Sequence, residues 1–346
     1  MQRLVAALAA AGHEVHLYSE NWEGMPDAVT LHRVKVQAPR ALRPVRFAEI
    51  VAQMMAPVTY DVVFSLERTV SQDVYRAGDG VHKVWLDQRR HYASWWRRPF
   101  VGLGAFHSNM MALEKRTLDP AATRHVIVNS EMVKQEIVRE FGYPAERIHL
   151  VRNGINAARF QQADRAGTRQ RLGLAEGDFV MLFVGSGWER KGLHFLLRLM
   201  SRLEKTDPQV KLLVVGKGRL AGPVPRNVIL AGPMPQVENA YAAADLLTFL
   251  PIYEPSSNVV PEALASGLPV ITSAFNGAAE WLTEGLNGHV LPAPEDTDAL
   301  EKAVRFWMAR PDARPVPCEH ALDLETNVRE TLRVLERVAA EKRAEG

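Results

Sequence analysis

The sequence predicts an α/β protein in which parallel sheets are covered by helices and divided between two domains. Short runs rich in Val, Ile and Leu alternate with helical patterns along the chain, which is the signature of such sheets. The chain has 346 residues, enough for two domains of roughly 150 residues each. Hydrophobic residues at 47% and charged residues at 24% are typical of an ordinary globular protein.

The alternation is most regular in the second half of the chain. Buried strands are expected at 179–185, 211–216, 227–231, 246–251 and 269–275. Helices are expected at 192–205, 236–244, 260–266, 278–284 and 296–309. Strands that alternate with helices in this way predict a single parallel sheet.

The first half repeats the pattern less cleanly, with strands expected at 14–19, 61–66, 125–129 and 148–152. Ser130 follows one of these strands, and its hydroxyl is expected to cap the next helix. The chain opens in a helical pattern that turns at Gly12 into a strand. A Rossmann-like sheet normally begins with a strand and a glycine-rich turn, so we expect the first strand of this domain to be missing.

These patterns divide the chain into three segments. An N-terminal Rossmann-like domain with a truncated start is expected at 1–155, and a second Rossmann-like domain at 156–324. Residues 153–155 and the polar stretch 161–169 look like a linker. Three prolines mark a second break, after which a closing helix occupies 325–346; they are Pro311, Pro315 and Pro317.

Composition excludes several classes of protein. Cys318 is the one cysteine, which rules out a disulfide framework or a cysteine zinc cluster and suits a reducing, cytoplasmic compartment. No run approaches the roughly 18 apolar residues of a membrane span, and the start is too short for a signal peptide. Residues 1–155 hold 20 Lys or Arg against 16 Asp or Glu. That excess is too small to predict nucleic-acid binding, although it fits an anionic partner.

A glycine-rich loop follows the strand expected at 179–185. It contains Gly185, Ser186 and Gly187, and then Arg190 and Lys191 before a helix. Small residues let backbone N–H groups approach a ligand, a helix start adds partial positive charge, and the two side chains add full charges. Such a loop suits a diphosphate. The alternative is an ordinary turn with two solvated cations.

A second loop lies between the strand expected at 246–251 and the next helix, with Pro261 in the first helical turn and Gly267 at the end. The backbone N–H groups around Asn258 to Val260 are expected to point outward and to hold an anionic or hydroxylated ligand. Glu262 can accept hydrogen bonds from two neighbouring hydroxyls, and Glu254 projects from the preceding loop. Either carboxylate can instead merely stabilise the helix start.

A dinucleotide pattern, Gly-x-Gly-x-x-Ala, occurs at 216–221 and offers a dehydrogenase as a rival function. The match is weak. Residues 222–225, Gly-Pro-Val-Pro, would stop the helix that should receive the pyrophosphate, and the ribose-binding acid does not follow the next strand.

Three features together resemble the family-4 retaining glycosyltransferases. The first is the pair of glutamates with seven residues between them, and the second is the following Ala-Leu-Ala-Ser-Gly-Leu-Pro-Val-Ile. The third is the Gly-Ser-Gly loop with Arg-Lys about 65 residues earlier. Residues 127–131 and 151–156 extend the resemblance. It implies the GT-B fold, two Rossmann-like domains facing across a cleft, with the closing helix crossing back to the N-terminal domain. Residues 73–82 and 90–93 look like those of lipopolysaccharide core glucosyltransferases, which glucosylate a heptose.

The resemblance also implies roles for individual residues. Arg190 and Lys191 would bind the donor diphosphate, Glu262 the ribose hydroxyls and Glu254 the hydroxyls of the transferred sugar, while Asp79 matches an active-site aspartate on the acceptor side. Catalysis would depend on these residues, Glu262 apart. The other donor-binding positions are Gly185, Ser186, Gly187, Gly216, Gly232, Ser257, Asn258 and Val259.

The implied activity is retaining transfer of a hexose, with UDP-glucose as the expected donor, to a lipopolysaccharide core or related glycolipid. No cofactor is expected, and no metal, because the two cations take its place. Two alternatives stay open: a catalytically impaired protein that still binds nucleotide sugar, and a transferase acting on another polysaccharide. The sequence does not decide the oligomeric state.

A basic and aromatic segment in the first half offers a membrane contact. Its residues are Arg89, Arg90, Trp95, Trp96, Arg97 and Arg98. Indole rings favour the membrane interface and arginines favour an anionic surface, so the segment could rest on the inner face of the cytoplasmic membrane and hold a lipid-anchored acceptor. The alternative is a solvated loop whose tryptophans pack into the domain.

Overall fold

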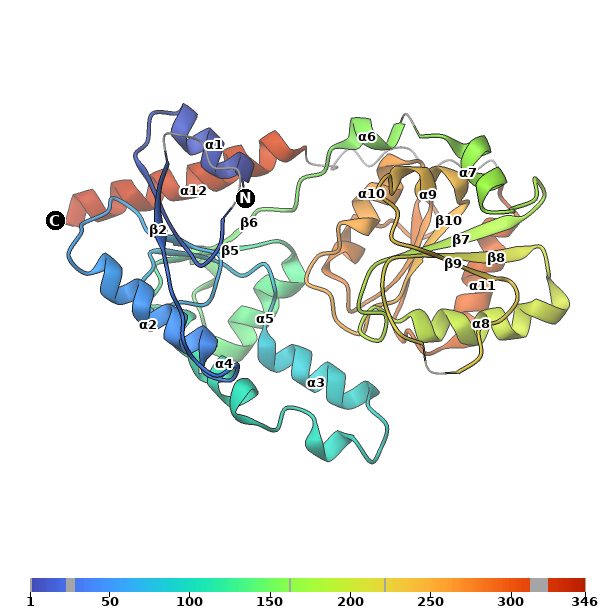
Figure 1. Cartoon of the computed structure of the whole chain (residues 1–346), viewed down its shortest axis with the longest axis horizontal. Helices are drawn as coiled ribbons and strands as arrows, with labels where there is room; N and C mark the ends of the chain where they lie inside the picture. Colours follow the sequence, from blue (N-terminus) through green and yellow to red (C-terminus); the bar gives the residue numbers. More distant parts are fainter. Residues whose placement is uncertain (1, 23–28, 162, 221, 312–322, 346) are drawn as a thin grey trace. The chain divides into compact units, whose positions relative to one another are not determined.

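A computed structural model describes residues 2–22, 29–161, 163–220, 222–311 and 323–345. The chain forms two compact units, one of residues 1–152 with 324–346 and the other of residues 153–323. The sequence placed these boundaries at 155 and 324. Both units consist of parallel strands joined by helices, as Figure 1 shows, so the predicted fold class is confirmed.

The second unit contains one sheet of six parallel strands in the order β12-β11-β10-β7-β8-β9. The strands are β7 (Phe179–Val184), β8 (Val210–Val215), β9 (Val228–Gly232), β10 (Leu246–Phe249), β11 (Val270–Ser273) and β12 (Gly288–Leu291). The helices are α6 (Ala157–Gln161), α7 (Arg165–Arg171), α8 (Leu193–Thr206), α9 (Glu238–Ala243), α10 (Val259–Ala265), the 3₁₀ turn η3 (Gly277–Trp281) and α11 (Thr297–Met308).

Numbered along the unit, this strand order is the 3-2-1-4-5-6 order of a Rossmann sheet. The direction in which the chain adds strands reverses between β7 and β10. Their central residues, such as Met181, Leu182 and Leu247, are fully buried. Ligands of such sheets bind outside the carboxyl ends of the strands at this reversal point, which selects the loops that follow β7 and β10.

Two expectations for this unit are wrong. The stretch 161–169 is not a linker, because α7 occupies 165–171 and packs beside α9. Its Arg169 is buried and donates hydrogen bonds to the carbonyl oxygens of Ala243 and Asp178. A polar sequence can therefore form a packed helix when a buried arginine meets backbone carbonyls. The helix expected at 278–284 is the short 3₁₀ turn η3.

The first unit contains a sheet in the order β3-β4-β5-β6 and a separate parallel pair, β1-β2. The strands are β1 (Val15–Ser19), β2 (Val29–Arg33), β3 (Phe64–Ser65), β4 (Val74–Arg76), β5 (His125–Val128) and β6 (Ile148–Leu150). The helices are α1 (Gln2–Ala10), α2 (Arg43–Met55), α3 (His82–Tyr92), α4 (Ala105–Thr117), α5 (Glu131–Phe141) and α12 (Leu324–Glu345), with the 3₁₀ turns η1 (Arg98–Phe100) and η2 (Ala145–Arg147).

The sequence predicts that the first strand of a Rossmann-like sheet is missing from this unit. Such a strand would join the two sheets. Its absence stays a prediction. The expected cap on α5 is confirmed, because the Ser130 hydroxyl accepts a hydrogen bond from the Val133 N–H at 3.3 Å. Among the described helices none is long and apolar enough to cross a membrane.

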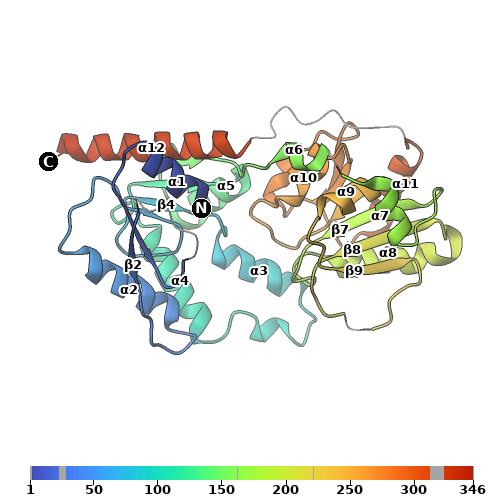
Figure 2. The same cartoon turned by 45° about the horizontal axis from the view of Figure 1, so that its top comes forward.

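Helix α12 covers one face of the β3–β6 sheet and lies beside α1 in both views (Figures 1 and 2). Its Val334, Leu335 and Val338 pack against the β4 and β5 residues Val74 and Ile127. Polar contacts fix the far end of the helix: the Lys342 amine lies 2.9 Å from the Asp73 carboxylate, and the Glu341 carboxylate lies 2.9 Å from Nε2 of His125. The last helix thus completes the core of the first unit.

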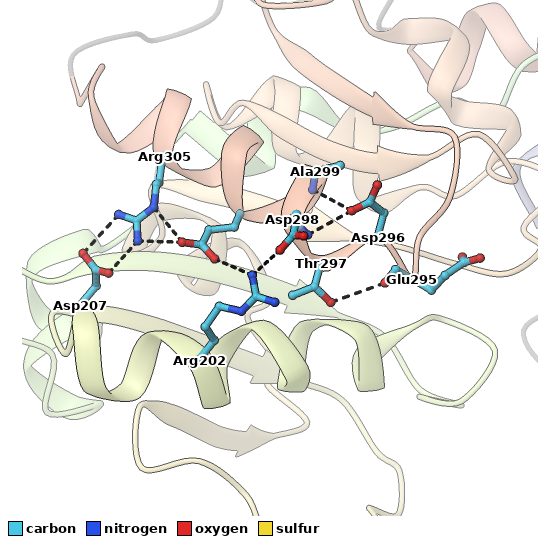
Figure 3. Close-up of polar contacts among 9 residues, drawn as sticks. Arg202, Asp207, Glu295, Asp296, Thr297, Asp298, Ala299 and Arg305 are labelled. Atoms are coloured by element: carbon cyan, nitrogen blue, oxygen red, sulfur yellow. Dashed lines mark hydrogen bonds and ion pairs between the residues drawn. The ribbon is translucent and has the colours of Figure 1, made fainter.

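Helices α8 and α11 of the second unit are joined by a network of charged side chains (Figure 3). Arg202 on α8 donates to Asp298 and Glu301 on α11, while Arg305 contacts Glu301 and Asp207. Single surface ion pairs contribute little to stability, and networks of several charges contribute more. These contacts fix how α11 lies beside α8 on this face of the sheet.

Stability should fall in acid because of a histidine pair beside α12. Nδ1 of His125 lies 2.9 Å from Nε2 of His149, and burial together with the nearby His125 lowers the pKa of His149 to about 4. An unfolded histidine takes up its proton near pH 6.5, so between pH 6.5 and about 4 the unfolded chain binds more protons and stability falls as pH falls. The urea midpoint should drop between pH 7 and pH 5, and it should drop less in His149→Gln.

The exposed His91 offers a matched control, since His91→Gln should keep the pH dependence of the parent. A parent and a His149→Gln variant with the same slope of midpoint against pH would contradict this account.

Candidate active site

The glycine-rich loop after β7 lies at the carboxyl end of its strand, where the reversal point of the sheet predicts a ligand. Gly185 and Gly187 adopt φ of +153° and +76°, and Gly192 adopts φ +78° at the start of α8. A Cβ atom on Gly192 would lie 1.7 Å from the carbonyl oxygen of Leu250, so only glycine lets this loop approach the end of β10. The loops after β7 and β10 therefore meet backbone to backbone.

Lys191 folds back over the start of the same loop. A Cβ atom on Gly185 would lie 2.7 Å from Cδ of Lys191 and 3.0 Å from its amine. The amine also lies 5.5 Å from the ring centre of Phe249, and burial lowers the pKa of Lys191, although Glu254 opposes that shift. The alternative of two solvated cations is wrong for Lys191. A half-buried amine without full hydration interacts strongly with an anion placed beside it.

Arg190 joins the two loops by its side chain and its backbone. Its Nη1 donates to Glu254 Oε2 at 2.7 Å and to the carbonyl oxygen of Tyr253 at 3.1 Å. Its own carbonyl oxygen accepts from the Ile252 N–H at 3.0 Å. The backbone of Glu254 is fixed in turn by the carbonyl of Phe275. The carboxylate and the cation that the sequence singled out in separate motifs are thus in direct contact.

Glu262 is held by a tyrosine from the neighbouring helix. The hydroxyl of Tyr241, a fully buried residue on α9, donates to Glu262 Oε2 at 2.7 Å. Burial raises the pKa of Glu262, and the hydrogen bond from Tyr241 opposes that shift. The bond from Tyr241 therefore fixes the orientation of the carboxylate on the first turn of α10.

The residue before the expected outward N–H groups is held by a buried amide. The Ser257 N–H donates to the Asn276 side chain at 3.3 Å, and that side chain donates to the Ser257 hydroxyl at 2.9 Å. Asn258 is exposed, and its side-chain oxygen accepts from Asn153 at 3.0 Å. Val259 is the first residue of α10, one position earlier than expected.

The carboxyl ends of β8 and β9 border the same loop. The Gly216 N–H donates to the carbonyl oxygen of Gly232 at 2.9 Å, and the Lys217 N–H donates to the Ser186 hydroxyl at 3.1 Å. Trp188 closes this side, because its indole N–H donates to the Gly185 carbonyl and its ring packs against Gly218. Gly218 thus serves the packing of a tryptophan, which removes the reason to interpret 216–221 as a dinucleotide turn.

Asp79 lies in the first unit, exposed in the segment between β4 and α3. The basic and aromatic segment follows α3, and its tryptophans do not pack into the domain: Trp95 is 82% and Trp96 53% exposed. Arg97 stacks on Trp96 at 4.6 Å, whereas Arg98 donates to the carbonyl oxygens of Ala93 and His91.

The sequence also contains an Asp-x-Asp pair, Asp296 and Asp298, whose spacing could suit a metal and which the expectation of a metal-free site did not consider. Figure 3 shows that both carboxylates bond other groups of the protein. Asp296 caps α11 by accepting from the N–H groups of Asp298 and Ala299, and Asp298 lies 2.5 Å from Arg202. Within the described ranges no group of three or more His, Cys, Asp or Glu side chains could hold a metal ion.

The comparisons with known proteins agree with this geometry. The family model Glycosyltransferase Family 4 matches residues 1–159, and the model Glycosyl transferases group 1 matches residues 164–330. The chain belongs to these glycosyltransferases. It is an enzyme that transfers hexosyl groups, and the two matched segments correspond to the two Rossmann-like units.

One curated relative and two solved structures are similar to this glycosyltransferase. The lipopolysaccharide glucosyltransferase WaaG of Escherichia coli K12 is 25% identical over 334 residues, which cover 92% of this chain and 87% of WaaG. A crystal structure of WaaG matches with a TM-score of 0.78 at 24% identity, covering 96% of this chain and 94% of that one. Anabaena Alr3699/HepE in complex with UDP matches with a TM-score of 0.65 at 18% identity, covering 90% and 87%. The GT-B fold is thereby shown.

The contact between the two loops can be tested with a matched pair of glycine substitutions. Gly187→Ala places a side chain at positive φ in open space and should cost about 1 to 2 kcal/mol of stability. Gly192→Ala carries the same backbone strain and also forces Leu250 to move, so it should cost about 1 to 3 kcal/mol more. Urea unfolding measures both, and equal losses would show that the loops do not meet as described.

Proposed function

We propose that the enzyme transfers a glucosyl group from UDP-glucose, with retention of configuration, to a sugar of a lipopolysaccharide core or a related glycolipid. The observation that carries the donor side is the contact of Arg190 with Glu254 beside Lys191, at the reversal point of the sheet. Two cations there suit a diphosphate, and a carboxylate next to them suits the hydroxyls of the sugar attached to it.

Glu262 extends this site toward the nucleoside. It lies at the start of α10, with one carboxylate oxygen bonded to Tyr241, and its second oxygen can accept from a ribose hydroxyl. The likeness in fold to a structure that holds UDP supports a nucleoside diphosphate as the class of ligand. Gly216 and Gly232, at the ends of β8 and β9, would border the base.

Charge decides the chemistry. Breaking the bond between sugar and phosphate leaves a diphosphate with extra negative charge, so fixed cations beside it stabilise the transition state more than the ground state. Lys191 suits this role because its half-buried amine faces an incoming anion without a full shell of water. The configuration would be retained if the acceptor hydroxyl attacks the sugar on the same face from which the diphosphate leaves. Asp79 would lie on the acceptor side and act through its position.

The acceptor assignment rests on the relatives. WaaG is named for glucosyl transfer in lipopolysaccharide biosynthesis, and its similarity extends over most of both chains. Residues 73–82, including Asp79, belong to the segment that resembles such enzymes. A transferase acting on another polysaccharide is the alternative, and a transfer assay with a lipopolysaccharide core acceptor separates the two.

The exposed face after α3 supports contact with an anionic membrane. Four apolar side chains lie in the open within nine residues: Trp95, Trp96, Phe100 and Leu103. Exposed aromatic rings beside arginines are the composition of an interfacial segment. Arg89 and Arg97 stack on Trp85 and Trp96 and would meet lipid phosphates beside these rings. Arg90 is paired with Asp87, and Arg98 donates to backbone carbonyls.

Transfer of labelled glucose from UDP-glucose to a purified lipopolysaccharide core acceptor tests the function. Arg190→Ala and Lys191→Ala should each lower kcat by about 30- to 1,000-fold, because each removes about 2 to 4 kcal/mol of transition-state stabilisation. Lys205→Ala removes the same charge from the exposed end of α8 and should leave transfer unchanged. No transfer by the parent, or full transfer by both loop variants, would refute the assignment.

Sedimentation with vesicles tests the membrane contact. The parent should bind anionic vesicles at low salt and release them at high salt, because each arginine near the surface contributes about 1 kcal/mol. A variant with Trp95→Ser, Trp96→Ser, Arg89→Gln and Arg97→Gln should lose binding, while Arg226→Gln, an exposed arginine of the second unit, should not. A parent that ignores anionic vesicles would end this proposal.

A further inference from the structure

A buried ion pair lies beneath the segment that carries Asp79. Arg68 follows β3 and Glu114 belongs to α4; their side chains are 8% and 2% exposed. Both Nε and Nη2 of Arg68 donate to Glu114 Oε1, at 3.0 and 2.9 Å. The two residues are 46 positions apart in the chain, and the sequence assigned neither of them a role.

Both members of the pair also hold the backbone of the segment from Ala77 to His82. Arg68 Nη2 donates to the carbonyl oxygen of Gly80 at 2.9 Å, and the His82 N–H donates to both oxygens of Glu114, at 2.9 and 3.1 Å. Gly80 has φ +70°, so the chain turns sharply directly after Asp79. The segment is thus fixed on the C-terminal side of Asp79 by two charged side chains.

A third side chain fixes the N-terminal side. Nδ2 of Asn129, at the carboxyl end of β5, donates to the carbonyl oxygen of Gly78 at 3.0 Å. The Oδ1 atom of this amide is buried and has no hydrogen-bond partner among the described residues, which is unfavourable. An amide that leaves its oxygen unpaired while its nitrogen holds Gly78 indicates that the position of this segment is under a constraint beyond stability.

The ion pair has the same character. Burying two charges is costly, and apolar side chains of similar volume often replace such a pair without loss of stability. Folding alone therefore gives little reason for Arg68 and Glu114. What an apolar pair could not do is bond the Gly80 carbonyl and the His82 N–H.

We propose that Arg68 and Glu114 are positioning residues that fix the Asp79 carboxylate for the acceptor through the backbone of Gly80 and His82. The proposal rests on the proposed function, in which Asp79 lies on the acceptor side. Neither residue contacts a substrate; both act through the segment that they hold. Misplacing a catalytic group by about 1 Å can lower the rate about 100-fold, so a segment held less rigidly should transfer poorly even in a folded enzyme.

The test uses the double substitution Arg68→Met with Glu114→Gln, because either single change would leave a buried charge unpaired and could prevent folding. In the full chain, kcat for transfer to the acceptor should fall about 10- to 100-fold. UDP binding by calorimetry should stay unchanged, because the donor loops belong to the other unit. Amide exchange over residues 77–85 should become faster, since the His82 N–H loses its charged acceptor.

The control removes another ion pair of the same unit, Arg124 and Glu345, through Arg124→Gln with Glu345→Gln. This variant should keep kcat and the exchange of residues 77–85. Normal kcat in the Arg68 and Glu114 variant would overturn the positioning role, whether or not exchange becomes faster. An equal loss of kcat in the control would overturn it too. Absence of transfer by the parent would instead contradict the proposed function.

Discussion

The close approach of Gly192 to the carbonyl oxygen of Leu250 is the contact on which the proposed donor site depends. No side chain fits between them, so the loops after β7 and β10 meet at backbone distance. That contact lets the Ile252 N–H reach the Arg190 carbonyl and lets the Arg190 side chain reach Glu254. Two motifs that are 64 residues apart in sequence thereby form one site.

Burial then gives the charges of this site their effect. Lys191 and Glu262 are both partly buried. Burial lowers the pKa of Lys191 and raises the pKa of Glu262, which in each case favours the neutral form. Between α8 and α11, Arg202 and Arg305 are about half exposed. Hydrogen bonds from these arginines lower the pKa of Asp207 and Glu301, so both acids keep their charge and the contacts serve packing (Figure 3). The contrast matters because a charge that has already lost part of its hydration is desolvated at less further cost when a charged ligand binds.

The sequence predicted most of the second unit because five of its strands are continuous apolar runs; β12, with Gly288 and His289, was missed. The first unit was harder to predict. Strands β2 and β4 contain His, Arg or Tyr, so no period marks them, and the strand expected at 61–66 is only the two-residue β3. The motifs identified Arg190, Lys191, Glu254 and Glu262, because each lies next to a strand end or a helix start.

Side chains that support those residues from a distance could not be found in this way. Tyr241 bonds Glu262 across 21 residues, and Arg68 bonds Glu114 across 46. Neither spacing falls on a helix face or a neighbouring strand position, so only the folded chain brings them together. The Asp-x-Asp pair shows the opposite case, in which a sequence motif suggests a site that the folded chain does not form. Its spacing fits a metal site, but the start of α11 uses one carboxylate as a cap and Arg202 pairs with the other.

Arg190 can bind a phosphate of the proposed donor while it is paired with Glu254. A guanidinium carries five N–H donors in a rigid fork, and in the described part of the chain the bonds to Glu254 and Tyr253 both come from Nη1. The rest of the fork can bond a phosphate while Nη1 keeps the carboxylate in place. Arg190 would then set the distance between the groups that hold the diphosphate and those that hold the sugar. A lysine, with a single ammonium group, could not fix both in one geometry.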